Sequence, residues 1–218
     1  MLCLCGLLVA ASLPAAAQPG RHGVRPSASA PLPRPEVMQL ATRAFQCAWK
    51  RDHVRRPVLT VIDYSLPSTE PRLWVIDMSA GRVLFHELVA HGRHSGEARA
   101  TRFSNEHGSK QSSLGLFRAE ETYHGQHGYS LRMSGLEPGV NDNARDRAIV
   151  MHGAGYVSRS HIAEHGRLGR SWGCPALARE VSRQVIDTIK DGSVVFAYYP
   201  DDDWLRASSF LRCDPEPL

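Results

Sequence analysis

The sequence predicts a β-rich α+β domain with one helix at its N-terminal end and a second helix directly after a cysteine. Three observations support this class. Seven short segments have strand character, few segments have helical spacing, and strands do not alternate regularly with helices. With 218 residues, the chain is long enough to bury the core of a single domain.

The first 35 residues are predicted to precede the folded body. Leu2 to Ala17 form an apolar run too short to span a bilayer, and three alanines before Gln18 resemble a cleavage site. We therefore expect a signal peptide at 1–17, although no Lys or Arg precedes its apolar run. Residues 18–35, rich in Pro, Ser, Gly and Arg, predict a flexible arm. Residues 36–218 remain as a single domain, with no membrane span after cleavage.

The domain is expected to begin with an amphipathic helix over Glu36 to Lys50 and to continue as strands. The predicted strands are Val58–Ile62, Leu73–Asp77, Arg82–Ala90, Ser113–Arg118, Tyr129–Met133, Ala148–His152 and Ser193–Tyr199. The loop from Met78 to Gly81 predicts a hairpin. A second helix is expected from Pro175 to Lys190, with Gly192 just after its end.

Three cysteines remain after the expected signal peptide, and an odd number in an exported protein requires an explanation. The economical one pairs Cys47 with Cys213 and leaves Cys174 as a free thiol. Such a bridge is typical of an oxidising compartment. The sequence leaves open whether the two cysteines come within bonding distance.

Cys174 and His152 are the candidate nucleophile and base. Pro175 is suited to the first position of a helix, so Cys174 is expected near the N-cap, where the helix dipole favours a thiolate. His152 is expected at the end of a buried strand, as the base that such a nucleophile requires. A small buried cysteine and a polar histidine at a sheet rim are the structural alternatives.

Taken together, His152-Gly153 and Ser171-Trp172-Gly173-Cys174 resemble the signature of the L,D-transpeptidase catalytic domain (YkuD-like) family, in its murein L,D-transpeptidase branch. The resemblance covers about residues 36–212 and implies a β-sandwich with a catalytic-cysteine helix. It extends over further segments: 63–65, 72–77, 89–92, 103–105, 112–115, 123–125, 127–131 and 141–145.

The resemblance implies acyl transfer between peptidoglycan stem peptides without a cofactor. Cys174 would form a thioester at the third-position residue, and His152 would shuttle protons. The backbone N–H groups of Cys174 and Gly173 would bind the oxyanion. Ser171 would either orient His152 or stabilise the turn. The bond formed would be a 3,3 or a 1,3 cross-link.

Two positions depart from the wider family, which usually has His where this chain has Trp172 and Arg where it has Ala176. That arginine is expected to bind a substrate carboxylate, so Arg170 is the nearest replacement, ahead of Arg167 and Arg147. Trp172 would form a flat wall for the stem peptide or simply pack. Other expected substrate contacts are Tyr129, His127 and Ser113, with packing as their alternative.

Several alternatives stay open from the sequence. The same thioester would serve an L,D-carboxypeptidase, and a degenerate site would make the chain a wall-binding protein. The histidines of 91–94 and 124–127 could instead ligate zinc in a metallopeptidase, although our main interpretation has no metal. His91 and His127 are otherwise expected to rim the cleft or to hydrogen-bond locally. We expect a monomer of the periplasm or cell envelope that binds no nucleic acid; the net charge of +4 decides little.

Overall fold

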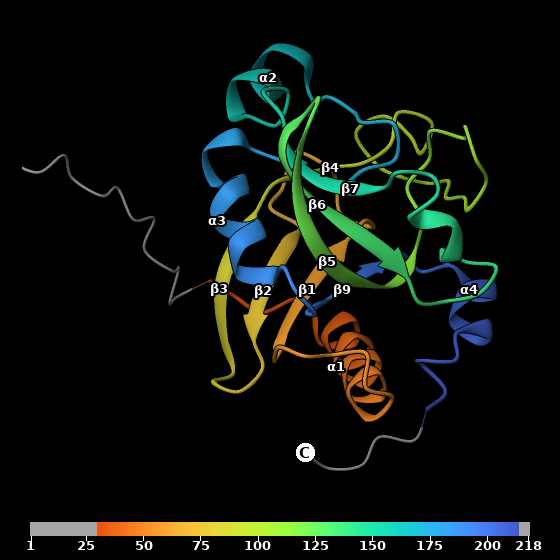
Figure 1. The fold of residues 1–218 in the computed structure, drawn as a ribbon. Helices are drawn as coiled ribbons and strands as arrows, with labels where there is room; N and C mark the ends of the chain where they lie inside the picture. Colours follow the sequence, from red (N-terminus) through yellow and green to blue (C-terminus); the bar gives the residue numbers. More distant parts are fainter. Residues whose placement is uncertain (1–29, 214–218) are drawn as a thin grey trace, which may run out of the picture.

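The computed structural model describes residues 30–213, and the expected signal peptide at 1–17 lies outside this range. Within it the chain forms four α-helices, one 3-10 helix and nine strands (Figure 1). The predicted β-rich α+β class is therefore confirmed. None of the described helices combines the length and apolar character needed to cross a bilayer.

Residues 30–34 are expected to end the flexible arm, yet they contact the folded body. The indole Nε1 of Trp74 donates to the carbonyl of Pro31 at 2.9 Å, and Arg34 pairs with the buried Asp63 carboxylate at 2.9 Å. Residues 31 and 34 thus contact the body of the domain, and the predicted division at residue 35 stays a prediction. Helix α1, Pro35–Lys50, follows directly with proline in its first turn, as predicted within one residue.

One half of the sheet consists of three antiparallel strands in chain order and a fourth strand that pairs parallel to the first of them. Strands β1 (Val58–Asp63), β2 (Leu73–Asp77) and β3 (Arg82–Glu87) pair antiparallel in chain order. Strand β9, Val194–Tyr198, pairs parallel to β1 on its other side. All residues of β1 and β9 are buried, as expected for central strands covered on both faces.

The other half carries the elements that reach the candidate site. Strands β5 (Gly115–Gly125) and β6 (Gly128–Gly135) form a hairpin with a two-residue turn, and β7 (Val150–Gly153) pairs with β6. Strand β8 (Ala176–Leu177) then joins β7 to β4 (Val89–Ala90). The full strand order is β3-β2-β1-β9-β5-β6-β7-β8-β4.

This order requires the sheet to curl back on itself. Strands β3 and β4 lie at opposite ends of the order, yet only Leu88 separates them along the chain. The two sheet edges must therefore meet, which gives the layered sandwich expected for the fold. The single strand predicted over Arg82–Ala90 is wrong, because the chain passes from one edge to the other at Leu88.

The second helix begins later than predicted. Helix α3 runs from Arg179 to Ile189 rather than from Pro175, and no side chain caps its start at Ala178. Ala176 and Leu177 are instead fully buried and pair with two strands as β8. Sheet pairing has therefore overridden the proline signal for a helix start, and α3 packs its apolar face mainly against β7.

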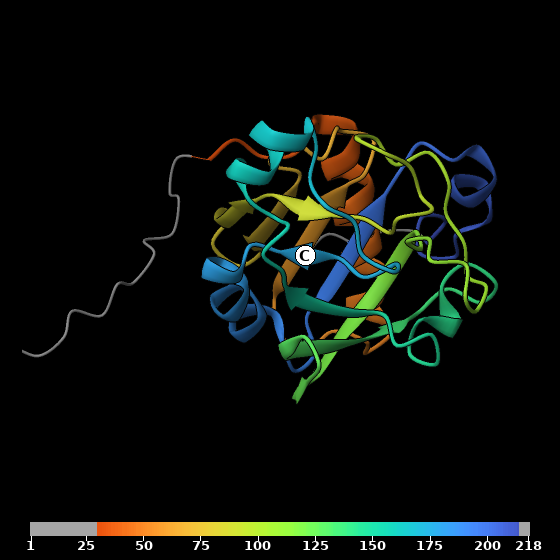
Figure 2. The same cartoon turned by 90° about the horizontal axis from the view of Figure 1, so that it is seen from above.

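Three short elements are absent from the sequence prediction: α2 (Arg159–His165), α4 (Asp202–Ala207) and a 3-10 helix at Asp142–Ala144. Ser158 caps α2 by accepting from the His161 N–H, and Asp201 caps α4 by accepting from the Trp204 N–H at 2.8 Å. Seen from above, α3 and α4 lie on opposite sides of the strands (Figure 2).

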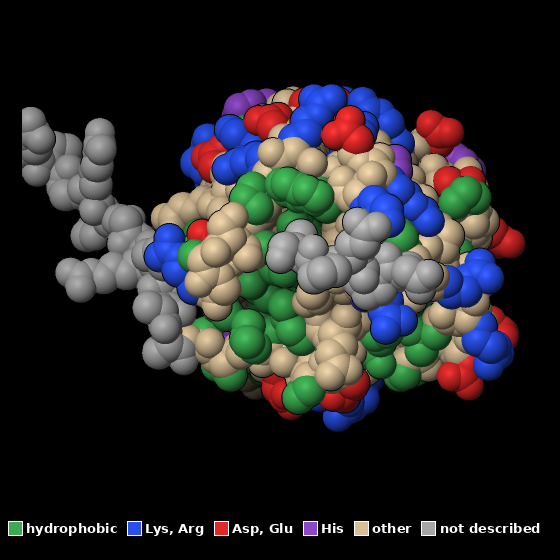
Figure 3. All heavy atoms as spheres, turned by 90° about the horizontal axis from the view of Figure 1, so that it is seen from below, with side chains coloured by type: hydrophobic (Ala, Val, Ile, Leu, Met, Phe, Trp, Pro, Cys, Tyr) green, Lys and Arg blue, Asp and Glu red, His purple; other side chains and the backbone are tan. Residues whose placement is uncertain are grey.

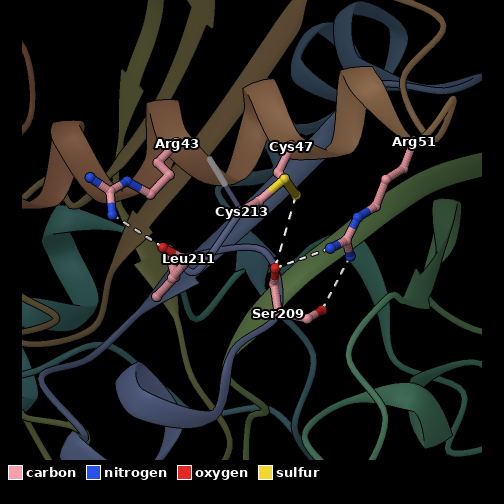
Figure 4. Close-up of a disulfide and its surroundings, with 6 residues drawn as sticks. All are labelled: Arg43, Cys47, Arg51, Ser209, Leu211 and Cys213. Carbon is pink, nitrogen blue, oxygen red and sulfur yellow. Dashed lines mark hydrogen bonds between the residues drawn. A yellow bond between two sulfur atoms is a disulfide. The ribbon is translucent and has the colours of Figure 1, made fainter. Parts of the chain in front are cut away.

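The expected disulfide between Cys47 and Cys213 is present, with Cα atoms 5.8 Å apart (Figure 4). It ties α1 to the segment after α4. Arg51 reinforces the connection by donating to the carbonyl of Ser209 at 3.2 Å, and Arg43 donates to the carbonyl of Leu211 at 3.3 Å. Cys174 is the one free cysteine of the described chain.

Two apolar clusters stabilise the fold. The larger lies among the strands and includes the buried side chains of Trp204 and Phe210. The smaller lies beneath α2 and the turn that contains Cys174. It consists of Leu88, Ala90, Ala154, Val157, Leu168 and Ala176. On the side of the molecule seen from below, hydrophobic side chains are visible in the middle and charged side chains around the rim (Figure 3).

Candidate active site

A cavity of about 390 Å³ contains the predicted nucleophile and base. Its lining residues are Gln126, His127, His152, Tyr156, Arg170, Ser171, Trp172 and Cys174. A larger groove of about 590 Å³ lies along α1, but no cysteine or histidine lines it. The chemistry predicted from the sequence therefore belongs to the smaller cavity.

Sheet pairing places Cys174 near His152. In the parallel pairing of β7 with β8, His152 lies opposite Ala176, two residues after the cysteine. A bridge between Gly92 and Ser171 anchors the other end of the same turn. Cys174 thus lies in a turn before a strand, not at a helix N-terminus. The predicted stabilisation of its thiolate by the dipole of the following helix is wrong.

Gly173 is required by the geometry of this turn. Its φ of +124° lies in the region that favours glycine. A Cβ at this position would lie 2.8 Å from the carbonyl oxygen of Gln111 and 2.9 Å from Cδ1 of Ile149. The Gly173 carbonyl also accepts from the Ser112 hydroxyl at 3.0 Å. The turn is therefore held close to the 111–112 segment, where no larger residue fits.

The Ser171 hydroxyl stabilises the turn from inside. It donates to the Cys174 carbonyl at 2.6 Å and accepts from the Gly173 N–H at 3.1 Å. Of its two expected roles, the structure shows the turn-stabilising one. The Gly173 N–H, expected as an oxyanion donor, is already used within the turn. The Cys174 N–H donates to no backbone carbonyl of the described chain.

The Cys174 thiol is only partly exposed and is neutral at rest. It donates to the carbonyl of Ala148 at 3.7 Å. Burial raises the pKa of this thiol above its ordinary value, although the Val150 N–H and the charge of Arg147 act in the opposite direction. A nucleophilic role for this sulfur would therefore require a base that removes the proton.

His152 has the tautomer that a base needs. Its ring is almost fully buried, and Nδ1 lies 3.1 Å from the carbonyl of Gly153. Because a carbonyl only accepts, Nδ1 carries the proton and Nε2 keeps its lone pair. Burial lowers the pKa of His152, and the neighbouring His127 lowers it further, while the bond to Gly153 raises it. The neutral form therefore dominates at pH 7.

His127 reaches the site from the tip of the β5–β6 hairpin. Its ring stacks on that of His152, with centroids 4.3 Å apart and an interplanar angle of 18°. The pairing of Ser130 on β6 with His152 on β7 brings the hairpin over the cavity. His127 thus rims the cleft, which was one of its two expected positions.

Trp172 and Arg170 lie at the other side of the cavity. Trp172 is 68% exposed, so it forms a wall of the cavity rather than packing in the core. The guanidinium of Arg170 is already paired with Glu97 at 2.5 Å and donates to the carbonyl of Gly96 at 3.1 Å. Binding of a substrate carboxylate by Arg170 stays a prediction and would compete with Glu97.

Two other predicted substrate contacts lie elsewhere. The Tyr129 hydroxyl donates to the Asp187 carboxylate on α3 at 2.5 Å, and Tyr129 does not line the cavity. Ser113 accepts from Arg147 at 2.6 Å and donates to the carbonyl of Ser104 at 2.9 Å. Both side chains therefore stabilise the fold around the site, which was their structural alternative.

Arg147 is used structurally rather than exposed to substrate. Its guanidinium donates to the carbonyls of Ser104 and Gln111, at 2.6 and 2.8 Å, and to the hydroxyls of Ser109 and Ser113, at 3.0 and 2.6 Å. These four bonds hold the 104–113 loop against the segment before β7. The same loop supports the turn at residues 171–174, through the bond from Ser112 to Gly173.

His91 and Arg72 form a buried support that the sequence interpretation missed. Nη2 of Arg72 donates to Nδ1 of His91 at 2.7 Å, so the proton of His91 lies on Nε2, 3.4 Å from the carbonyl of Gly96. Burial lowers the pKa of His91 to about 3, which keeps it neutral. Its carbonyl accepts from the Ser171 N–H at 3.0 Å. His91 thus bonds locally, beneath the turn.

Tyr156 and Gln126 also line the cavity and were not predicted. Burial, together with the nearby Cys174, raises the pKa of Tyr156 to about 12, so its hydroxyl stays protonated. Tyr156 follows the His152-Gly153 pair by four residues, and this closeness to a candidate base was the signal available.

No group of three His, Cys, Asp or Glu side chains within residues 30–213 is arranged to hold a metal ion. The histidines of the two predicted pairs have other neighbours there. His94 bonds the carbonyl of Ser109 at 2.9 Å, and the ring of His124 lies 5.2 Å from that of Tyr129. The zinc-peptidase alternative therefore has no candidate site in this range.

The model of the L,D-transpeptidase catalytic domain family matches residues 30–198. The chain belongs to this family. Its resemblance to the family, first drawn from the His-Gly and Ser-x-Gly-Cys segments, is thereby confirmed. A comparison with curated protein sequences gives no match.

Solved L,D-transpeptidases are similar to this chain at low identity. One from Mycobacterium smegmatis shares 14% identity at a TM-score of 0.42, over 66% of this chain and 59% of that one. The helical cell shape determining protein of Campylobacter jejuni shares 11% at 0.44, over 73% and 57%. L,D-transpeptidase 3 of Mycobacterium tuberculosis shares 16% at 0.38, over 66% and 61%. The chain spans about three fifths of their lengths.

Within this L,D-transpeptidase catalytic domain, Ala176 explains one departure from the wider family. Its side chain is fully buried in β8 between two neighbouring strands. An arginine at this position would have to bury its charge in the sheet. Ala176 therefore provides no group that could bind a substrate carboxylate, and β8 has no room for one.

Proposed function

We propose that this protein is a peptidoglycan L,D-transpeptidase that joins stem peptides through a thioester on Cys174. One observation carries the proposal. A neutral Cys174 thiol and a neutral His152 with an unprotonated Nε2 line the same cavity, in a chain of the L,D-transpeptidase catalytic domain family.

In the first half-reaction, Sγ of Cys174 attacks the carbonyl carbon after the third-position residue while Nε2 of His152 takes the thiol proton. The Cys174 N–H, which has no backbone acceptor within residues 30–213, donates to the oxyanion. The tetrahedral intermediate then breaks its C–N bond. The leaving D-Ala amine takes the proton from His152, and the thioester remains.

In the second half-reaction, an amine of a neighbouring stem attacks the thioester carbonyl and gives its proton to Nε2 of His152. The C–S bond breaks, and the departing thiolate recovers this proton. A new amide links the two stems, and the neutral pair is restored. Because His152 serves both steps, its loss should abolish turnover as completely as loss of Cys174.

The cell envelope is the compartment that we propose for this reaction. The disulfide between Cys47 and Cys213 supports an oxidising compartment, since such bridges persist outside the cytosol. The apolar run at 2–17 supports export, although it lies outside the described residues. We propose a monomer acting on stem peptides, without nucleic acid.

The test is mass analysis of muropeptides after incubation of purified sacculi with the protein and with its Cys174→Ala variant. We expect new cross-linked dimers with the wild type and none with the variant, and fragmentation assigns the bond as 3,3 or 1,3. The thermal midpoints of the two proteins should agree, which shows that the variant is folded.

Other outcomes would replace the proposal. Trimmed stems without dimers would make the protein an L,D-carboxypeptidase, in which water attacks the same thioester. Turnover that survives in Cys174→Ala, or that is lost in EDTA and restored by zinc, would contradict cysteine catalysis. Binding to sacculi without any change of muropeptides would favour the wall-binding alternative.

A further inference from the structure

A second cavity adjoins the catalytic one at Trp172. It has a volume of about 580 Å³, and its lining residues are Arg93, His161, His165, Arg167, Gly169, Arg170 and Trp172. Arg170 and Trp172 line both cavities. The two spaces are therefore neighbours that share these two lining residues. We call the second space the α2 subsite, because His161 and His165 belong to α2.

The α2 subsite carries surplus positive charge. Three arginines line it, and Glu97 is the carboxylate that pairs with two of them, at 3.0 Å from Arg167 and 2.5 Å from Arg170. The bond from Arg170 lowers the pKa of Glu97, so this carboxylate is ionised at pH 7. Within residues 30–213 the guanidinium of Arg93 forms no hydrogen bond or ion pair and is exposed to solvent.

The two histidines of the subsite lie side by side on α2. The rings of His161 and His165 lie 4.2 Å apart in an edge-to-face arrangement. Burial lowers the pKa of His161, and the charges of His165 and Arg167 lower it further. The attraction for an anion that we infer here rests on the three arginines of the lining.

The position of His152 bears on which substrate faces this subsite. His152 lines the catalytic cavity and a third cavity of about 410 Å³, but it does not line the α2 subsite. The departing amine must receive a proton from Nε2 of His152, and the entering amine must give one to the same atom, so both amines lie within reach of His152 and away from the α2 subsite. The acyl part of the donor is therefore the part that can extend past Cys174 toward Trp172.

We propose that the α2 subsite binds free carboxylates of the acyl-donor stem peptide, with Arg93 as its principal anion partner and Arg167 as the second. The identification of the ligand as an acyl donor rests on the proposed function. The subsite would supply the anion recognition that the buried Ala176 cannot. Trp172, 68% exposed, would stack on the peptide between the thioester position and the arginines.

Binding to the non-reactive Cys174→Ala variant tests the subsite directly. Two probes are titrated into it by calorimetry: a stem tetrapeptide, and the same peptide with its side-chain carboxylates converted to amides. We expect the amidated peptide to bind about tenfold more weakly, as loss of charge-assisted hydrogen bonds predicts. Addition of Arg93→Gln should weaken binding of the carboxylate peptide similarly and leave the amidated peptide unaffected.

Arg159→Gln is the matched control, because this substitution removes the same charge. Arg159 is exposed on α2 and lines neither cavity. Equal binding of the two peptides, or equal effects of Arg93→Gln and Arg159→Gln, would overturn the proposal. If these binding results overturn the subsite but the protein still cross-links sacculi, the proposed function remains intact. Carboxylate-dependent binding without turnover on sacculi would instead retain the subsite and contradict the transpeptidase.

Discussion

The rings of His127 and His152 stack with their centroids 4.3 Å apart and their planes inclined by 18°. Both are imidazoles, so protonation of one disfavours protonation of the other. Burial is the larger cause of the lowered pKa of His152, and the charge of His127 adds to it. The hairpin tip therefore helps to keep the base neutral under mildly acidic conditions.

This stack predicts the acidic limb of the pH profile. In the proposed mechanism His152 must be neutral, so kcat/KM should fall as the pH drops through a pKa below the ordinary value of 6.5. His127→Gln removes the like charge, and the acidic limb should move to higher pH. His124→Gln, on the same hairpin but outside the cavity, should leave the limb in place. An unchanged limb in His127→Gln would show that burial alone sets the pKa.

The neutral thiol predicts how Cys174 reacts with an alkylating agent. Burial raises the pKa of this thiol, so its rate of alkylation by iodoacetamide should keep rising with pH beyond the ordinary pKa of a cysteine. Mass analysis of the peptide that contains Cys174 gives the rate. A rate that is already constant between pH 6 and 8 would instead indicate a pre-formed thiolate–imidazolium pair.

Gly173 gives a prediction with an internal control. Gly173→Ala requires a non-glycine residue at φ +124° and a Cβ only 2.8 Å from the Gln111 carbonyl oxygen. We expect a loss of about 1–3 kcal/mol in the free energy of unfolding, measured by urea denaturation, and nearly complete loss of turnover. Gly139→Ala also has a positive φ, of +76°, but meets no atom within 4 Å. It should cost less stability and leave turnover intact.

Local signals in the sequence predicted most of the elements. The apolar spacing of Pro35–Lys50 gave α1, and period-two or continuous apolar runs located β1, β2 and β9 within one residue. The signal for Cys174 and His152 was also local, because both belong to short motifs; the structure brings them to one cavity, and their catalytic roles stay a prediction. Even α2 had a readable signal, Ser158 at its start and Gly166 at φ +69° after its end.

What could not be predicted depends on contacts between distant segments. The start of α3 was wrong because Ala176 and Leu177 gain more from pairing with two strands than from joining a helix. Arg72 and His91, which form the supporting bond, are 19 positions apart in the sequence, and no local sequence pattern predicts that an arginine will be buried. Ser113 bonds Arg147 and Tyr129 bonds Asp187, and in each pair the two residues come together only when the chain folds.

The disulfide predicts a stability that depends on redox conditions. Removal of the bridge by the double variant Cys47→Ala/Cys213→Ala should lower the free energy of unfolding by about 2–5 kcal/mol. Turnover should persist at temperatures where the variant is folded, because Cys174 remains. After alkylation under non-reducing, unfolding conditions, Cys174 should be the only labelled position among the three cysteines of 30–213. Labelling of all three would contradict the bridge.

Substitution of Trp172 is predicted to weaken binding of the stem peptide without lowering the stability of the fold. Its side chain is 68% exposed, and its one ring contact among the described residues is with Nζ of Lys110, 5.0 Å from the centroid. Trp172→Ala should therefore change the free energy of unfolding by no more than about 0.5 kcal/mol. It should raise KM for the stem peptide about tenfold, as expected for loss of an aromatic anchor.

Trp49→Ala is the control for this prediction, since Trp49 is also exposed, at 44%, but lies on α1 beside Phe45. Its KM should match that of the wild type. If Trp172→Ala instead lowered the thermal midpoint and left KM unchanged, the indole would be a packing residue. The two cavities that share it would then be separate spaces, and the donor peptide would have no wall along which to reach Arg93.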